Sequence, residues 1–317
     1  DVALRMAEAA TGRRGVIATD ATYHGTATAL SWLSTRRPPI CGRPDHVRLI
    51  PPPAAPRPPG GDAAGQGAAF AARVRAAIAE LEAAGHGLAA LILCPVFATE
   101  GLPCLPRAAL AAAMAAVRQA GGLVIADEVQ CGFGRTGRMW GHETAGIAPD
   151  IVTVGKAMGN GYPLAAVATR ADVMEAFRGA FGYFNTMAAT PVAAAAGMAV
   201  LEAMAREGLV ENAASVGAHA LARLREIDHP AVGGVRGQGL ALAMDLVEPD
   251  GVSPAGALAS DVAEGMRDRG VLIGTIGPAG NVLKIRPPLC FSRENAETLA
   301  DALADALAAA PAPGLPA

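Results

Sequence analysis

The chain has 317 residues, of which 52% are hydrophobic and 17% are charged, which predicts a globular protein with one large and one smaller domain. Its formal net charge is −3 and its sequence pI is about 6.1, so it lacks the basic field that attracts nucleic acid or acidic membranes. The five cysteines include no CxxC pair, which favours reduced thiols and a cytoplasmic location over a disulfide framework. We expect neither a nucleic-acid partner nor a membrane anchor.

The first two-thirds of the chain alternates apolar runs with helical patterns. Residues 2–9 begin with apolar side chains at helical spacing. Further helices are predicted over 69–84 and 106–120. Apolar runs without polar alternation predict strands that are covered on both faces, as in a parallel sheet; they occupy residues 15–20, 88–94, 122–127 and 150–155. This βαβ order predicts an α/β domain, and the Pro- and Gly-rich residues 37–67 predict a long surface loop.

The pattern changes after a helical region at 190–226. Residues 233–247 predict a turn and a strand, and a helix over 255–269 follows. Short strands within 271–285 and a last helix over 292–308 complete the chain. We therefore predict a large domain over residues 1–205 and a smaller C-terminal α+β domain over 206–317.

Chemically useful side chains follow the predicted strands, where open α/β sheets bind their ligands. Tyr23 and His24 follow the first run, Asp127 ends the third, and Lys156 follows the fourth. Singly, these residues are typical of a surface lysine, a turn cap and a loop. Together they supply a ring that can stack, an acid that can hold a protonated heterocycle and an amine that can form a Schiff base. Pyridoxal 5′-phosphate requires these groups.

The use of lysine at position 156 strengthens this interpretation. The chain has only two lysines, Lys156 and Lys284, and otherwise uses arginine for positive charge. A guanidinium stays protonated and is not a nucleophilic amine, so arginine cannot replace a Schiff-base lysine. Glycine motifs elsewhere match neither a GxGxxG dinucleotide fold nor a GxxxxGK phosphate loop.

Several stretches together resemble a known family. DEVQCGFGRTG (127–137) and PDIVTVGKAMGNGYPLAAV (149–167), with ATYHG, YFNTMAATPVAAAAGMAVLE and VLKIRPPLCFS in the same order, resemble the class III (omega-type) pyridoxal-phosphate-dependent aminotransferases of fold type I. The resemblance covers essentially the whole chain. The YFNT and KAMGNGYPLA stretches are most similar to the subgroup of alanine–glyoxylate aminotransferase 2-like proteins and phospholyases.

The resemblance implies a mostly parallel central sheet with helices on both faces, plus a smaller C-terminal α+β domain. It also implies transfer of an amino group between an amine or amino acid and a 2-oxo acid, in a homodimer with shared active sites. Two alternatives remain open. One is phospholyase or racemase chemistry on the same cofactor, and the other is a truncated or non-catalytic homologue.

The resemblance also implies roles for single residues. Lys156 would bind the cofactor as a Schiff base and move a proton, while Asp127 would pair with the pyridine nitrogen. Tyr23 and Val129 would press on the two faces of the ring, and Gln130 would reach its phenolic oxygen. The remaining candidates are His24, which would support its loop, Thr186, which would bind the phosphate from the neighbouring subunit, and Arg286, which would grip the substrate with Lys284 as the other candidate.

Departures from the family pattern limit these expectations. A segment resembling SGTEAN would precede the first helix and hold the phosphate at a helix N-terminus; the chain begins after it, so we expect an incomplete large domain and weak cofactor binding. Cys94 stands where the family usually has the glutamate of Glu-Pro-Val, and Ala188 and Ala189 replace two glycines.

Overall fold

The structure is a computed structural model that describes residues 1–35, 38–55 and 62–310. Parts of the predicted 37–67 loop, and the last seven residues of the predicted small domain, lie outside the described residues. The elements in chain order are α1 (Val2–Thr11), β1 (Gly15–Thr19), α2 (Thr28–Ser31), β2 (Val47–Ile50), α3 (Ala63–Ala83), β3 (Leu88–Leu93), α4 (Ala111–Gln119), β4 (Leu123–Asp127), α5 (Gly141–Ala145), β5 (Ile151–Val154), η1 (Lys156–Met158), β6 (Ala166–Thr169), α6 (Ala171–Ala180), α7 (Pro191–Arg206), α8 (Leu209–Arg225), β7 (Val232–Gln238), β8 (Ala241–Leu246), α9 (Gly256–Asp268), β9 (Gly274–Ile276), β10 (Val282–Ile285) and α10 (Arg293–Ala309).

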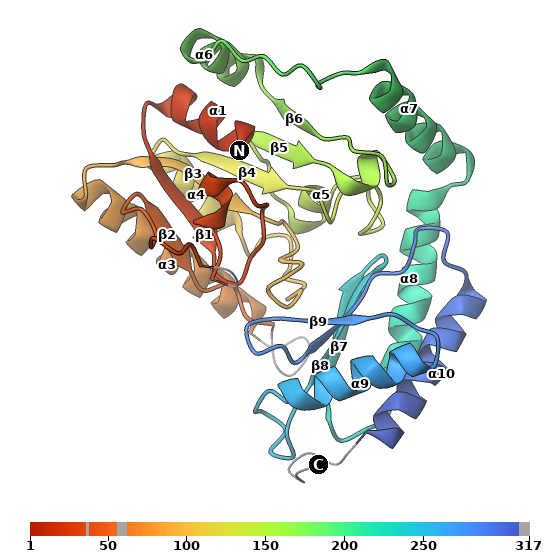
Figure 1. Ribbon diagram of the computed structural model, residues 1–317. Helices are drawn as coiled ribbons and strands as arrows, with labels where there is room; N and C mark the ends of the chain where they lie inside the picture. The colour runs from red at the N-terminus through yellow and green to blue at the C-terminus, as the bar shows by residue number, and fades with distance from the viewer. Residues whose placement is uncertain (36–37, 56–61, 311–317) are drawn as a thin grey trace.

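The first sheet, sheet A, has the strand order β2-β1-β3-β4-β5-β6. All of its neighbouring strands run parallel except β6, which is antiparallel to β5. The four predicted strands of the first two-thirds are confirmed as β1, β3, β4 and β5. The mostly parallel α/β fold expected from the sequence is therefore confirmed (Figure 1).

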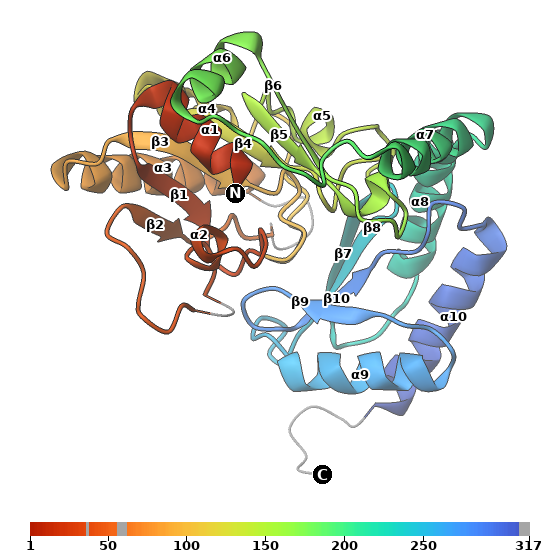
Figure 2. The ribbon, with the colours of Figure 1, turned by 45° about the horizontal axis from the view of Figure 1, so that its top comes forward.

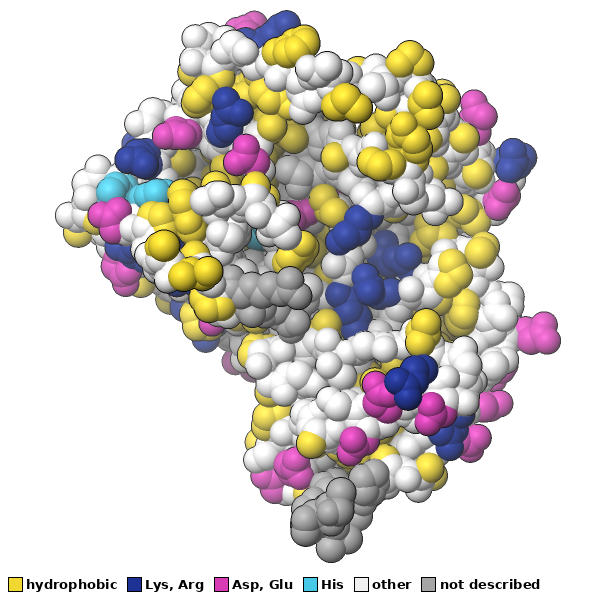
Figure 3. All heavy atoms as spheres, in the orientation of Figure 1, with side chains coloured by type: hydrophobic (Ala, Val, Ile, Leu, Met, Phe, Trp, Pro, Cys, Tyr) yellow, Lys and Arg dark blue, Asp and Glu magenta, His cyan; other side chains and the backbone are white. Residues whose placement is uncertain are grey.

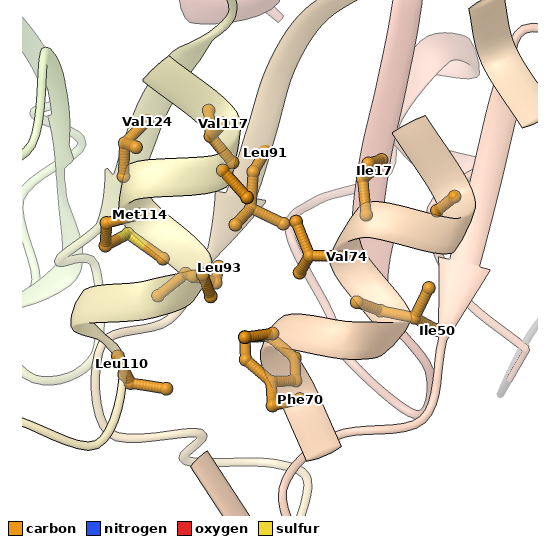
Figure 4. Close-up of a cluster of buried hydrophobic side chains, with 14 of the residues drawn as sticks. Ile17, Ile50, Phe70, Val74, Leu91, Leu93, Leu110, Met114, Val117 and Val124 are labelled. Carbon is orange, nitrogen blue, oxygen red and sulfur yellow. The ribbon is translucent and has the colours of Figure 1, made fainter. Parts of the chain in front are cut away.

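Sheet A is buried on both faces because its apolar side chains alternate between two cores. Ile17, Leu91 and Val124 pack with Phe70 of α3 and with α4 (Figure 4). Val16 and its same-face neighbours instead pack with α1 and α6. Since side chains alternate across a strand, an uninterrupted apolar run serves both cores. This explains why the runs lack polar alternation.

The second sheet, sheet B, is antiparallel with the order β7-β8-β10-β9. One face packs on α8, α9 and α10 through a core that includes Leu283 and Ile285. The other face meets the segment that follows β3, in a cluster that includes Cys94, Leu102 and Val282. Figure 2 shows sheet B and its helices beside the carboxyl ends of sheet A.

Arg236 connects sheet B to the segment that follows β3. The Arg236 side chain on β7 pairs with Asp245 on β8, with Nη1 and Oδ2 2.7 Å apart. Its Nε donates to the Leu102 carbonyl (2.7 Å) and its Nη2 to the Gly101 carbonyl (2.5 Å). These hydrogen bonds fix sheet B against the segment after β3.

Two predictions of local structure were wrong, and one strand was missed. Residues 37–67, which we predicted to be a loop, contain strand β2, whose four residues pair in parallel with β1. Residues 233–247 form a hairpin rather than one strand, since Gly239 adopts a left-handed φ of 54° at the turn. A side chain at Gly239 would collide with the backbone at Gly137. Strand β6 was not predicted.

Within the described ranges, no helix combines the length and the apolar character needed to cross a membrane.

Candidate functional site

Asp127 and Lys156 reach the same edge of sheet A from adjacent strands. Asp127 ends β4, where it pairs in register with Thr153 of β5. Lys156 follows three residues later, directly after β5. The backbone N–H of Glu128 donates to the Thr153 carbonyl at 2.9 Å, which keeps the two chain segments together beyond the paired residues. Both residues therefore stand at the carboxyl edge of sheet A, where open α/β sheets bind their ligands.

The Asp127 carboxylate is buried and held by two donors. His24, from the loop after β1, places Nδ1 2.7 Å from Asp127 Oδ2, and the His24 side chain is only 1% exposed. The other carboxylate oxygen accepts the backbone N–H of Val129 at 3.0 Å. His24 Nε2 lies 3.2 Å from the Thr22 hydroxyl. This chain of contacts fixes the direction of the carboxylate.

Lys156 adopts a strained backbone conformation. Its φ is 42°, in the left-handed region that non-glycine residues rarely adopt. Such a conformation costs on the order of 1 kcal/mol and persists where the surrounding structure imposes it, often at functional sites. The side chain is exposed, and its amine has no ion-pair partner among the described residues. An exposed primary amine is thus carried just past the strand next to the one that Asp127 ends.

A cavity of about 850 Å³ opens beside Asp127. His24, Val129 and Asp127 line it from the carboxyl edge of sheet A, and α1 together with residues 183–188 lines it from the other sides. Tyr23, Gln130 and Lys156 do not line this cavity. Tyr23 is 48% exposed in the loop after β1.

A second pocket lies between the two sheets. It is lined by Gln130, Arg135, Lys284 and Arg286 together with apolar residues. The guanidinium of Arg286 donates to the Gln130 side-chain carbonyl at 3.2 Å, so Gln130 connects the cofactor-side loop to sheet B. In the space-filling view, Lys and Arg side chains gather in the hollow between the two halves of the molecule (Figure 3).

Thr186 is exposed in the segment between α6 and α7. The same segment exposes Tyr183, Phe184 and Met187, with Phe184 82% and Met187 76% exposed. Asn185, Met187 and Ala188 line the large cavity, whereas Thr186 does not. The structure therefore does not bring Thr186 together with Asp127 in one chain.

Sequence reasoning missed the structural role of Glu128. This glutamate is 2% exposed and accepts the backbone N–H groups of Gly141 (2.8 Å) and His142 (2.7 Å) at the start of α5. It also accepts the Cys131 thiol at 3.0 Å. In the sequence, only its position next to Asp127 pointed to this role. The arrangement anchors the loop that carries Val129 and Gln130.

The site fits pyridoxal 5′-phosphate in the chemistry of its donors. A buried carboxylate whose oxygens are held by His24 and the Val129 amide can pair with a protonated ring nitrogen. An exposed primary amine stands just past the neighbouring strand at Lys156, and apolar Val129 offers a surface for a flat ring. The residues present thus match a cofactor that carries an aldehyde, an aromatic ring and a ring nitrogen.

Comparison with known proteins places the whole chain in one family. The model of the aminotransferase class-III family matches residues 1–307. The chain is 37% identical over 308 residues to alanine–glyoxylate aminotransferase 2 homolog 2, mitochondrial, of Arabidopsis thaliana, and 35% identical over 315 residues to ethanolamine-phosphate phospho-lyase homolog 1 of Caenorhabditis elegans. These alignments cover 95% and 93% of this chain.

Solved structures give the same result. A phospholyase from Arthrobacter in complex with phosphoethanolamine superposes with a TM-score of 0.92 at 44% identity, covering 98% of this chain and 74% of that one. A PLP-bound amine transaminase from an uncultivated Pseudomonas species gives a TM-score of 0.87 at 31% identity, with 98% and 74% covered. The fold is therefore that of fold type I pyridoxal-phosphate enzymes.

The alignments cover nearly all of this chain but only part of the length of each relative. The chain spans 63% of the length of the Arabidopsis relative and 68% of the Caenorhabditis relative. The PLP-bound structural neighbour and the family model both imply pyridoxal 5′-phosphate as the cofactor. With its fold, its strand-end Asp127 and Lys156 and the match over residues 1–307, the chain belongs to the class-III aminotransferase family.

Proposed function

We propose that the protein is a pyridoxal-phosphate-dependent aminotransferase that moves an amino group between an amine or amino acid and a 2-oxo acid. The observation that carries the proposal is that the ends of two adjacent strands carry a buried, doubly hydrogen-bonded carboxylate at Asp127 and, just past the second strand, an exposed amine at Lys156. The family match supports the same activity. The cofactor supplies a conjugated ring that accepts the electron pair left when a bond to the substrate Cα breaks.

Lys156 would hold the cofactor covalently through its amine nitrogen. Once displaced by the amino group of a substrate, the same nitrogen is a base that can remove a proton from the substrate Cα and return it on the far side of the conjugated system. The strained φ of 42° directs the side chain from the end of β5. Arginine could not do this work, because its guanidinium remains protonated.

Asp127 would keep the ring nitrogen protonated by placing a negative charge against it. His24 positions that carboxylate through the 2.7 Å contact. Tyr23 and Val129 would confine the ring from its two faces, and Gln130 would reach the phenolic oxygen. Arg286 donates a hydrogen bond to Gln130, so the residue proposed to bind the substrate contacts a residue proposed to bind the cofactor. This contact supports a substrate-binding role for Arg286.

A homodimer with shared active sites is part of the proposal. Thr186, proposed to bind the cofactor phosphate of the partner subunit, lies on a surface that exposes Tyr183, Phe184 and Met187. This surface continues onto α7, where Val192 is 60% and Met198 56% exposed, and clustered exposed apolar side chains are typical of protein interfaces. Within each chain, we propose that the large and small domains divide near residue 205, where α7 ends. We also propose a cytoplasmic location, which the free cysteines support.

Phospholyase chemistry on a phosphorylated amine is the second candidate. The Arthrobacter structure at 44% identity is a phospholyase in complex with phosphoethanolamine. The cations Arg135, Lys284 and Arg286, which lie close together between the two sheets, would favour a substrate with a strongly anionic group.

Product analysis tests the proposal and separates the two candidates. An aminotransferase consumes the amine only when a 2-oxo acid is present and releases no ammonia. A phospholyase needs no 2-oxo acid and releases ammonia and inorganic phosphate in equal amounts. A separate sample of the protein is incubated with pyridoxal 5′-phosphate and reduced with borohydride, and the labelled peptide is identified by mass spectrometry. Absence of label on Lys156 would overturn both candidates.

A further inference from the structure

Two of the five cysteines lie side by side at the carboxyl edge of sheet A. Cys94 follows β3 directly, and Leu93 before it pairs in register with Ala126 of β4. The Sγ atoms of Cys94 and Cys131 are 3.9 Å apart. Both residues are buried, since Cys131 is 0% and Cys94 is 7% exposed. The two thiols are therefore in contact, although 37 positions separate them in the chain.

The turn after β4 brings the Cys131 side chain to Cys94. The backbone N–H of Gly132 donates to the Glu128 carbonyl at 2.9 Å, which closes the turn. The Cys131 thiol donates to Glu128 Oε2 at 3.0 Å. Beside it lies Gly141 of α5, where a Cβ atom would stand only 2.7 Å from Cys131 Sγ. Helix α5 therefore limits the space into which this thiol can turn.

The space beside the thiol pair suits only a small oxidant. Cys131 lines the second pocket, between the two sheets, together with Gln130 and Lys284. This pocket has room for about one water molecule. Hydrogen peroxide is larger than water by a single oxygen atom, whereas oxidised glutathione is a tripeptide disulfide and is far too large to enter. The pocket therefore favours hydrogen peroxide over bulky disulfides as the reactant.

The environment of the pair keeps it protonated and reduced at rest. Burial, followed by the neighbouring Cys94 thiol, raises the pKa of the Cys131 thiol well above its ordinary value, and the Glu128 carboxylate acts in the same direction. Since the thiolate is the reactive form of cysteine, oxidation at neutral pH is slow. Glu128 offsets part of this barrier, because its carboxylate already accepts the proton that the sulfur must release. The pair is therefore suited to sustained rather than brief exposure to peroxide.

We propose that Cys94 and Cys131 form a redox-sensitive pair, which hydrogen peroxide converts into a disulfide that lowers the activity of the neighbouring site. The Cys131 sulfur attacks peroxide: an S–O bond forms, the O–O bond breaks, and the released hydroxide leaves as water with the Cys131 proton. The Cys94 sulfur then attacks this sulfenic acid: an S–S bond forms, the S–O bond breaks, and a second water leaves with the Cys94 proton. Both thiols are oxidised, and the peroxide is reduced to water.

The disulfide acts on the site through the loop that carries Gln130. Once oxidised, the Cys131 sulfur has no proton to donate to Glu128, and it moves toward Cys94 to form the bond. Gln130 precedes Cys131 directly, so this movement displaces it. The loss of activity rests on the proposed function, in which Gln130 contacts the cofactor. Formation of the disulfide does not depend on that function.

Peptide mapping tests the disulfide itself. The exposed thiols are first removed by Cys41→Ser and Cys290→Ser, so that they cannot form bonds between molecules. After treatment with hydrogen peroxide, we expect an intact mass lower by two hydrogen atoms and a cross-linked Cys94–Cys131 peptide, both reversed by dithiothreitol. Oxidised glutathione at the same concentration should leave the pair reduced. Cys104→Ser removes the remaining thiol; it is the matched control and should still give the cross-link.

Kinetics test the effect of the disulfide on the site. A displacement of about 1 Å near reacting groups can cost about 10²-fold in rate, so we expect the oxidised protein to lose about tenfold or more in kcat/KM. The assay uses the amine that the product analysis identifies. Dithiothreitol should restore the activity. Cys94→Ser cannot form the disulfide and should keep its activity through the same peroxide treatment.

Absence of the Cys94–Cys131 cross-link, under conditions that oxidise the exposed thiols of the unaltered protein, would overturn the inference. A cross-link that leaves kcat/KM unchanged would overturn the role of the pair as a switch. Neither result affects borohydride labelling of Lys156, on which the proposed function depends. If Cys94→Ser does not fold, peptide mapping with both buried thiols in place and the recovery of activity with dithiothreitol still decide.

Discussion

Sheet A is covered by helices on both faces, whereas sheet B has helices on one face only. The strands of sheet A therefore carry chemistry only where they end, as at Asp127 and just beyond Val154 at Lys156. Sheet B turns its second face toward sheet A, so a polar side chain can stand in the middle of a strand, as Lys284 does on β10. The chain's two lysines thus occupy different kinds of position, one past the end of a strand of sheet A and one within a strand of sheet B.

The two lysines also differ in exposure and in backbone conformation. Lys156 is exposed and held in a strained backbone conformation. Lys284 is half-buried among cations and sits in regular β-structure. If Lys156 acts as a nucleophile and Lys284 acts only through its charge, arginine should abolish the function of the first and preserve that of the second, since arginine retains charge but not nucleophilicity.

The largest expected effect follows from Lys156→Arg. The variant should lose cofactor attachment and at least about 10³-fold in kcat/KM, because the nucleophile and proton carrier is gone. Visible absorbance after incubation with pyridoxal 5′-phosphate and mass analysis after borohydride reduction measure the first loss. Lys284→Arg is the control and should still be labelled at Lys156. A label that persists on Lys284 in the Lys156→Arg variant, with activity retained, would show that the two lysines have been assigned in reverse.

Asp127→Asn should have the next largest effect. A neutral amide no longer favours the protonated ring nitrogen, so kcat should fall about 10²- to 10³-fold, as for removal of a preorganised charge. The fold should survive, because the asparagine oxygen can still accept the Val129 amide. Steady-state kinetics and thermal unfolding measure the two properties. Turnover at the parent rate would mean that Asp127 does not touch the ring nitrogen.

The sequence could predict the strand-end residues because the rule that locates them is local. An uninterrupted apolar run predicts a strand that is covered on both faces, and ligands bind at the carboxyl end of such strands. Asp127 and Lys156 stand at the ends of two such runs. The contact of His24 with Asp127 joins residues 103 positions apart, and no periodicity encodes it. Lys284 was recognised as a candidate only by its place before Pro287, since its exposure depends on which face of β10 meets sheet A.

The hairpin of β7 and β8 was missed for a similar reason. Residues 233–247 carry apolar side chains on both sides of the turn, so the run reads as one strand. The turn is set by the left-handed Gly239 and by its close approach to Gly137, which is a tertiary contact. Strand β2 was hidden in a Pro-rich context that predicts a loop.

Arg236→Met tests how sheet B is fixed against sheet A. The substitution removes the arginine that forms an ion pair with Asp245, which is 2% exposed, and both hydrogen bonds to the segment after β3. Leaving a buried carboxylate without its cation costs about 3–5 kcal/mol. Urea unfolding measures the loss in the free energy of unfolding. Arg267→Met is the control: this exposed arginine of α9 pairs with Glu264 and Asp268, so its loss should change stability by less than about 1 kcal/mol.

A smaller loss from Arg236→Met than from its control would show that sheet B is held by its apolar contacts alone. The cluster of Cys94, Leu102 and Val282 would then be the connection to disrupt.

The smallest predicted effects compare two serines on the helices that cover sheet B. Ser292 caps α10: its hydroxyl accepts the Asn295 amide at 3.1 Å, and the Asn295 side chain accepts the Ser292 amide at 3.1 Å. Ser292→Ala removes a cap and should cost about 1 kcal/mol. Ser260 lies inside α9, exposed, with its hydroxyl bonded to the Gly256 carbonyl at 3.2 Å. There alanine is the better helix former, so Ser260→Ala should stabilise by a few tenths of a kcal/mol, about 0.5 at most.

Replacing serine by alanine is therefore expected to lower the free energy of unfolding at position 292 and to raise it at position 260. Urea unfolding of both variants beside the wild type measures the difference, which should be about 1 to 1.5 kcal/mol. Because both helices pack on the same core of sheet B, an effect on that core would move both variants in one direction. Two losses of equal size would therefore show that the serines act through the packing of sheet B rather than through capping and helix propensity.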